Sequence, residues 1–100
     1  MAIRILLEAQ AEANEAYLYY KARSNRTATL FRAELRAAFK LAETRPESFR
    51  RILGNVRTCR MKVYPYTVLF EVFPDYIEVI AVMHLKRDPG YWHERLKDRD

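Results

Sequence analysis

The sequence predicts an α+β fold, in which a helical hairpin packs on one face of a mostly antiparallel sheet. Two observations carry this prediction. Apolar residues recur at spacings of three and four through much of the first half of the chain, which is the period of an amphipathic helix. After residue 55 the period becomes two, which is typical of strands. The order strand, helix, helix, three strands and a short helix is that of one α+β domain spanning residues 1–100.

The first half of the chain is predicted to form one strand and two helices. Residues 2–7 read as a short strand, and residues 8–20 carry the first helical stripe. Residues 24–27 form a break with good N-cap residues, after which a second helix runs to about residue 43. Pro46 stops this helix, because the residue before a proline leaves helical geometry. So short a break predicts an antiparallel helical hairpin.

The second half is predicted to form a three-stranded meander. Residues 46–55 are expected to be an irregular basic loop, and the strands are expected at residues 56–63, 66–73 and 76–85. Asp88 and Pro89 read as the N-cap and first residue of a short C-terminal helix. With the hairpin on one face of the sheet, we expect the opposite face to stay mostly open.

Composition excludes several classes of protein. Half of the 100 residues are apolar and 31% are charged, which suits a globular fold and argues against disorder. The apolar run at residues 79–85 is too short to cross a bilayer, and the start of the chain lacks the features of a signal peptide. We therefore expect a cytoplasmic protein with no membrane partner.

Cys59 is the single cysteine, which excludes an internal disulfide and disfavours a thiolate zinc site. We predict no metal and no cofactor.

Positive charge is concentrated in one stretch. Residues 45–62 contain six basic residues and one acidic residue, a local charge of +5 that equals the net charge of the whole chain. Such an excess favours a nucleic acid, a ribonucleoprotein or an acidic protein as a partner. The alternative is a solvated surface that serves solubility.

Two segments carry a resemblance to a known family. Residues 57–62 followed by YPYTVLF at 64–70 resemble the pattern of an arginine, then Phe/Tyr-Pro-Tyr, then an apolar strand in the RelE/ParE family of bacterial toxins. Residues 77–84 followed by KRDPGYW at 86–92 resemble the family's ending. The likeness covers almost the whole chain. It implies a cytoplasmic toxin of a type II toxin–antitoxin system, of the kind linked to plasmid stabilisation and growth arrest. A cognate antitoxin would neutralise it and would provide its only connection to operator DNA.

The family contains two mechanisms, and the resemblance favours the ParE-like one. ParE-like members inhibit DNA gyrase, whereas RelE-like members cleave messenger RNA on the ribosome. Thr67 occupies the place where RelE-like members have a second strand arginine, and His93, rather than a tyrosine, falls at the terminal position. A shift of one or two residues would place Tyr91 there instead. A third possibility is an inactive toxin that only binds its antitoxin and regulates the operon, so whether the chain is an enzyme stays open.

If the chain is RelE-like, four residues are the catalytic candidates. Strand alternation places Arg60, Lys62 and His84 on the open sheet face, with Arg87 just beyond the last strand. The cations would neutralise phosphate, and His84 or His93 would transfer protons. Each also has a structural interpretation, such as a solvated sheet face or an ion pair.

Partner binding is expected at the basic stretch, at the C-terminal segment and at leftover apolar residues of the first helix. Exposed apolar surface beside basic charge suits an acidic, amphipathic partner. Tyr91 and Trp92 have a second interpretation, as a hydrophobic anchor for the C-terminal segment. The candidate partner-binding residues are Arg50, Arg51, Arg57, Arg87, Tyr91, Trp92, Leu18 and Tyr19.

Overall fold

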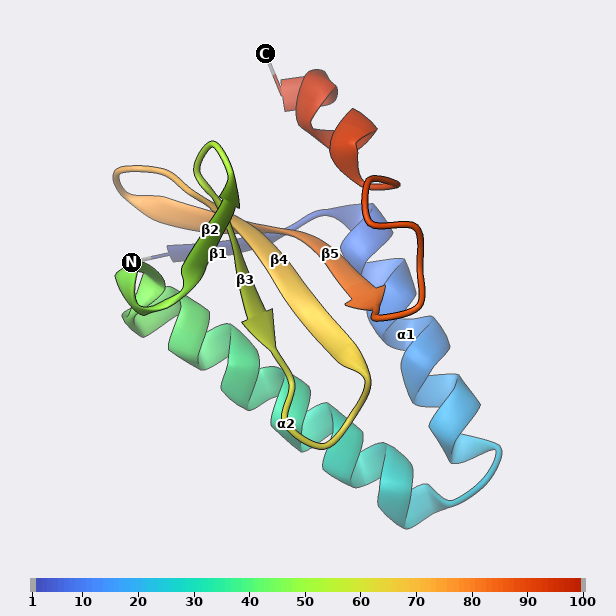
Figure 1. The fold of residues 1–100 in the computed structure, drawn as a ribbon. Coiled ribbons are helices and arrows are strands. Elements are labelled where there is room, and N and C mark those ends of the chain that lie inside the picture. The colour runs from blue at the N-terminus through green and yellow to red at the C-terminus, as the bar shows by residue number, and fades with distance from the viewer. Residues whose placement is uncertain (1, 100) are drawn as a thin grey trace.

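The computed structural model describes residues 2–99, and the side chains of residues 2–96. Five strands form one sheet in the order β1-β5-β4-β3-β2, in which only the β1–β5 pair is parallel (Figure 1). The predicted α+β fold is therefore confirmed. The elements are β1 (Ala2–Ile5), α1 (Leu7–Lys21), α2 (Asn25–Thr44), the 3₁₀ turn η1 (Pro46–Ser48), β2 (Arg50–Leu53), β3 (Val56–Arg60), β4 (Tyr66–Val72), β5 (Tyr76–His84) and the 3₁₀ helix η2 (His93–Arg99).

The helical hairpin covers one face of the sheet, as predicted. Ser24 caps α2, because its side chain accepts a hydrogen bond from the backbone N–H of Thr27 at 3.2 Å. The apolar stripes of both helices pack against the inward side chains of β3, β4 and β5. The fully buried aromatic rings of this core are Phe31 from α2 and Phe70 from β4.

The predicted loop at residues 46–55 is wrong, because part of it is the edge strand β2. Arg50 pairs with Thr58 of β3 in an antiparallel hairpin, and Gly54 and Asn55 form its two-residue turn. Gly54 has a φ of 53°, a backbone conformation that glycine adopts freely and that residues with a β-carbon disfavour. The Gly-Asn pair in the sequence was a usable hairpin signal.

Strand β3 ends at Arg60, three residues earlier than predicted. The carboxylate of Glu34 on α2 accepts hydrogen bonds from the backbone N–H groups of Lys62 and Val63. The hydroxyl of Tyr64 donates to the carbonyl of Thr27 at 2.9 Å. These contacts hold residues 62–64 against α2, so the ladder with β4 ends after the hydrogen bond from the N–H of Met61 to the carbonyl of Tyr66. At the other end of the chain, the first strand stops at Ile5 because α1 begins two residues later.

Strand β5 contains a bulge that the alternation rule missed. Leu69 of β4 faces Ala81, but the next residue, Phe70, faces Val79, which leaves Ile80 as the extra residue. Beyond the bulge every side chain changes face. Simple alternation along the predicted strand 76–85 would place Ile77 and Ala81 on one face. The bulge separates them, and Val82 belongs with Ile77 in the core under the helices.

The second face of the sheet is partly covered, although it was expected to be mostly open. Trp92, which is 2% exposed, packs with Val56, Leu69, Ile80 and Ala81 in a second cluster. The C-terminal segment that brings Trp92 there runs back beside the start of α1 (Figure 1).

The C-terminal helix starts at His93 rather than at Pro89. Asp88 is therefore not the predicted N-cap of this helix, and its Oδ1 accepts instead from the N–H of Gly90 at 3.2 Å in a tight turn. A series of tight turns comes next, in which His93 N–H bonds to the carbonyl of Gly90 and Arg95 N–H to that of Trp92. This i to i+3 pattern gives a 3₁₀ helix. Among the described residues, no helix combines the length and apolarity that a bilayer crossing requires.

Candidate functional site

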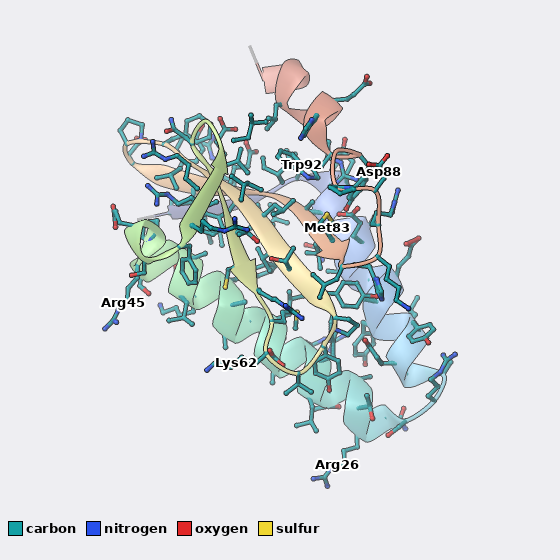
Figure 2. All side chains as sticks on the ribbon, in the orientation of Figure 1. Arg26, Arg45, Lys62, Met83, Asp88 and Trp92 are labelled. Carbon is teal, nitrogen blue, oxygen red and sulfur yellow. The ribbon has the colours of Figure 1, made fainter. Side chains whose placement is uncertain are left out.

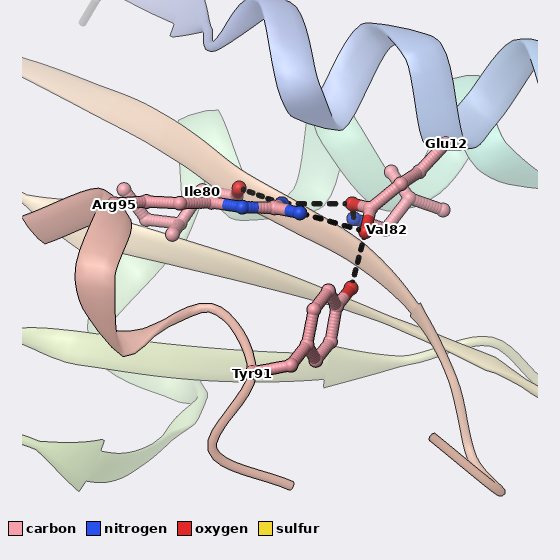
Figure 3. A network of polar contacts seen from close by, with 5 residues as sticks. All are labelled: Glu12, Ile80, Val82, Tyr91 and Arg95. Carbon is pink, nitrogen blue, oxygen red and sulfur yellow. Dashed lines mark hydrogen bonds and ion pairs between the residues drawn. The ribbon is translucent and has the colours of Figure 1, made fainter. Parts of the chain in front are cut away.

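Glu12 on α1 is the centre of a polar network that holds the C-terminal segment (Figure 3). Two nitrogens of the Arg95 guanidinium donate to its two carboxylate oxygens, each at 3.0 Å. The hydroxyl of Tyr91 donates to Glu12 Oε2 at 2.5 Å. Both members of the ion pair are largely buried, with side-chain exposures of 15% for Arg95 and 13% for Glu12. A two-point arginine–carboxylate pair with a third donor fixes both position and orientation.

The same network satisfies the backbone of β5 where its neighbour strand ends. The last β1 contact is the hydrogen bond from Leu6 N–H to the carbonyl of Val79. Beyond that point Glu12 Oε1 accepts from Val82 N–H at 3.0 Å, and Arg95 donates to the carbonyl of Ile80 at 2.9 Å. The side chains of Glu12 and Arg95 thus bind backbone groups of β5 that a neighbouring strand would otherwise bind.

Burial and the Glu12 hydrogen bond raise the pKa of Tyr91 well above its ordinary value of 10.0. Burial acts because it disfavours the charged phenolate, and the carboxylate acts because it accepts the phenolic proton. Tyr91 therefore holds its proton as a structural donor in this network.

A pocket of about 360 Å³ lies between α1 and the end of β5. His84 packs edge-on against Tyr66, with ring centroids 5.0 Å apart, and its Nδ1 accepts from the N–H of Lys86. The guanidinium of Arg87 lies 4.0 Å from the centroid of the Tyr91 ring, a cation–π contact. The structure thus brings together four predicted residues, which are Tyr19, His84, Arg87 and Tyr91.

The catalytic candidates do not share one face. Arg60 faces Thr67, which faces Met83, whereas His84 faces Tyr66 on the side covered by the helices. The bulge in β5 is the physical reason, because it reverses the face of every later residue. The expectation that Arg60, Lys62 and His84 lie together is therefore wrong.

Arg60 belongs to a different pocket from His84 and Arg87. It lines a groove of about 330 Å³ on the other face of the sheet, together with Arg50, Met83 and Trp92. Lys62 lies exposed on the loop beside α2, apart from Met83 and Trp92 (Figure 2).

The arginines of the edge hairpin have different surroundings. Arg57 is half-buried and donates to the carbonyl of Phe49 at 2.8 Å, which ties β3 to the segment before β2. Arg51 faces Arg57 across the ladder, and both Arg50 and Arg51 are exposed. Exposed arginines on an edge strand are available to a partner, and they also discourage pairing between sheet edges.

Of the remaining partner-binding candidates, two are exposed on α1 and one is buried. Leu18 and Tyr19 are 60% and 52% exposed, and the guanidinium of Arg23 covers the Tyr19 ring at 3.7 Å. Trp92 is buried, which favours its interpretation as an anchor of the C-terminal segment.

Sequence reasoning missed Glu12. The available signal was its helical spacing from Ala9 and Ala16, because an acid beside a buried stripe needs a partner.

Cys59 is buried, and burial, with the nearby charge of Glu34, raises the pKa of its thiol. Within the described part of the chain, no group of three or more His, Cys, Asp or Glu side chains is placed to hold a metal ion.

Comparisons with known proteins agree with this architecture. Residues 3–89 match a family model described as "ParE toxin of type II toxin-antitoxin system, parDE". A solved structure of a chromosomal ParDE toxin–antitoxin system from P. aeruginosa is similar with a TM-score of 0.74. That match has 16% sequence identity and covers 86% of this chain and 97% of the other, so it shows the shared fold. No curated protein matches the chain.

Proposed function

The chain belongs to the ParE toxin family of type II toxin–antitoxin systems, and from this premise we propose that it poisons DNA gyrase and that a cognate antitoxin holds it inactive. In this proposal the toxin works in the cytoplasm as an inhibitor that binds its target, and not as an enzyme. It reaches operator DNA only through the antitoxin.

The separation of Arg60 from His84 is the observation that supports gyrase over messenger RNA. Cleavage of a phosphodiester by 2′-hydroxyl attack needs a base, an acid and cations around one phosphate. Here the strand cation and the histidine lie on opposite faces of the sheet. Thr67 adds no cation, because its side chain is uncharged, and its buried hydroxyl is hydrogen-bonded to that of Thr58 at 2.5 Å.

Pulse labelling after induction of the chain alone distinguishes the two targets. We expect DNA synthesis to stop first, with a DNA-damage response, and protein synthesis to continue in the first minutes. With purified gyrase, the toxin should block supercoiling and accumulate cleaved DNA, and the purified antitoxin should prevent both effects. Unchanged supercoiling at saturating toxin would exclude the proposal. If induction slows neither synthesis nor growth, the chain is an inactive toxin that binds only its antitoxin.

One observation favours messenger RNA cleavage as the second candidate. The pocket beside β5 does bring His84 and Arg87 together with three tyrosines, and this set offers one cation and several groups that carry exchangeable protons. For this candidate, protein synthesis would stop first, and His84→Ala would abolish toxicity while the protein stayed folded. For the gyrase proposal, His84→Ala should leave toxicity within about twofold, because the residue then has no proton to transfer.

A further inference from the structure

A groove between the two helices takes no part in the Glu12 network or in the pocket beside β5. We call it the helix groove, and its volume is about 300 Å³. It opens on the side of the hairpin that faces away from the sheet, because its rim residues are exposed and its floor consists of buried core residues. This volume lies at the lower end of the range for small-molecule sites. The lining residues are Gln10, Ala13, Asn14 and Tyr17 of α1, and Phe31, Arg32, Leu35, Arg36 and Phe39 of α2.

The rim that α2 contributes to the helix groove is basic. Arg32 and Arg36 are about one helical turn apart, so their side chains are neighbours on one face of α2. Both residues are exposed, and within the described part of the chain neither forms an ion pair or donates a side-chain hydrogen bond. No Asp or Glu lines the groove among the described residues. Both guanidinium groups are therefore available to one anionic group.

Tyr17 holds one of these two arginines at the groove. The guanidinium of Arg32 lies 3.8 Å from the centroid of the Tyr17 ring, which is a cation–π contact. A guanidinium that lies over a ring still presents N–H groups at its edge, where they can donate to a ligand. Because the contact orders a long side chain before any ligand arrives, less conformational entropy is lost on binding.

The rim that α1 contributes carries two carboxamides. Gln10 and Asn14 are also about one turn apart, and both are exposed. Within the described residues, neither side chain has a hydrogen-bond partner. A carboxamide offers a donor and an acceptor side by side, which is the pattern that pairs with the N6 and N7 atoms of adenine. The half-buried ring of Phe39 lies in the same groove and offers apolar surface to a flat ring.

We infer that the helix groove binds a small nucleotide of the adenosine monophosphate class. The phosphate would bridge Arg32 and Arg36, since contacts between guanidinium and phosphate are charge-assisted and often two-point. The adenine would lie against Phe39, with its polar edge on the carboxamide of Asn14. The inference stands apart from the proposed function, because neither gyrase nor the antitoxin enters it.

The two rims and the floor favour this ligand over simpler ones. An inorganic anion would use the two arginines alone, and a nucleoside would use the carboxamides and the apolar surface alone. A nucleoside monophosphate uses both rims at once. The preferred base is adenine, because guanine presents two acceptors, O6 and N7, where adenine presents a donor and an acceptor.

Isothermal titration calorimetry with the purified full-length toxin, in a buffer without phosphate, tests the inference. Adenosine monophosphate should bind with a Kd of about 10–100 µM. Inorganic phosphate, adenosine and guanosine monophosphate should each bind at least about tenfold more weakly, because each lacks one set of contacts. Nuclear magnetic resonance on the native chain locates the site, and the largest ligand-induced amide shifts are expected in residues 10–17 and 31–39.

The variant Arg32→Gln/Arg36→Gln removes the basic rim at two exposed positions. It should weaken binding of adenosine monophosphate by about tenfold or more. The matched control is Arg26→Gln/Arg45→Gln, which removes the same charge at exposed sites near the two ends of α2 (Figure 2). This control should change binding by less than about twofold, because distant exposed charges are largely screened at physiological salt.

The variant Gln10→Ala/Asn14→Ala tests the opposite rim. It should reduce the preference for adenosine monophosphate over guanosine monophosphate to less than about twofold, while the affinity for inorganic phosphate stays the same. Alanine is a good helix former, so α1 should remain intact, and circular dichroism checks that each variant is folded.

Four results would overturn the inference. They are absence of binding at about 1 mM adenosine monophosphate, equal losses in the two arginine variants, ligand-induced shifts outside the helix groove, and binding of inorganic phosphate as tight as that of the nucleotide. Tighter binding of a single-stranded oligodeoxynucleotide at equal phosphate concentration would also contradict it, because the groove would then hold a nucleic acid backbone. The shift map is measured on the native chain, so it decides the question even if a variant fails to fold.

Discussion

Glu12 and Arg95 lie 83 residues apart in the sequence and form a two-point ion pair, with both N···O distances at 3.0 Å. This pair joins the first helix to the C-terminal segment, and the same two side chains complete the backbone bonding of β5. One carboxylate therefore binds the residues on either side of the buried Trp92, namely Tyr91 and Arg95.

Replacing Glu12 with glutamine should destabilise the toxin by about 2 kcal/mol, because it leaves a largely buried guanidinium without its counter-charge. The C-terminal segment should loosen first, so the emission of Trp92 should shift to longer wavelength in the native state. Urea unfolding followed by circular dichroism gives the free energy of unfolding. The control is Glu43→Gln, which breaks a surface ion pair with Lys40 and should cost less than about 0.5 kcal/mol. Equal losses in the two variants would contradict the role given to Glu12.

Stability should fall at alkaline pH, and Tyr91 should contribute to the fall. The folded state raises the pKa of Tyr91 above its unfolded value of 10.0, so its stabilising contribution is complete below pH 10. The contribution is lost as pH rises above 10, because the unfolded state then releases the proton first. Burial raises the pKa of Tyr20, Tyr64 and Tyr66 in the same direction.

Urea midpoints measured from about pH 8 to about pH 11.5 check this prediction, because they span the ordinary pKa of tyrosine. Tyr91→Phe should be less stable than the native chain near neutral pH and should lose less stability above pH 10. If the native chain and the variant decline in parallel, Tyr91 does not hold its proton as the structure implies.

Ser24→Ala should lower the free energy of unfolding by about 1 kcal/mol, since it removes the acceptor for the N–H of Thr27 at the start of α2. Ser24→Asp keeps an acceptor at this position and should retain most of the stability. Thermal unfolding followed by circular dichroism compares the two. An aspartate variant as unstable as the alanine variant would show that the cap is not the cause.

Gly54→Ala should destabilise the β2–β3 hairpin by about 1 kcal/mol, because an alanine at a φ of 53° is strained. The strain is purely of the backbone, since a β-carbon at this position meets no heavy atom within 4 Å. Gly54→Asn should cost less, because asparagine tolerates the left-handed region. Amide exchange of β2 is the measurement, and faster exchange is expected in the alanine variant than in the asparagine variant.

The sequence correctly predicted the elements that depend on residues close to one another in the chain. The stripe that contains Phe31 and Leu35, the Ser24 cap and the period-two face of β4 each depend on residues within a few positions of one another. The hairpin turn at Gly54 had a local signal too, and the dense positive charge around it favoured an irregular loop instead.

Features that depend on distant contacts could not be predicted. Ile80 is an ordinary apolar strand residue, and nothing in its neighbours announces a bulge. A bulge interrupts the hydrogen bonding of the ladder. Here the side chains of Glu12 and Arg95, which come from distant parts of the chain, bind the backbone N–H of Val82 and the carbonyl of Ile80 instead.

The candidate site divides in the same way. Four predicted candidates, Tyr19, His84, Arg87 and Tyr91, lie at the pocket beside β5, but Glu12, which also lines it, was missed. The face on which His84 lies was predicted wrongly.

The bulge at Ile80 determines on which face of the sheet each later side chain of β5 lies. Substitutions along β5 alter one side chain at a time, whereas the gain or loss of a single residue at the bulge exchanges the two faces of every later strand residue. With an unbroken ladder, His84 would stand on the same face as Arg60 and Thr67. In a fold of this kind, one insertion or deletion can therefore place a histidine and an arginine on the same face or on opposite faces, with the rest of the architecture unchanged.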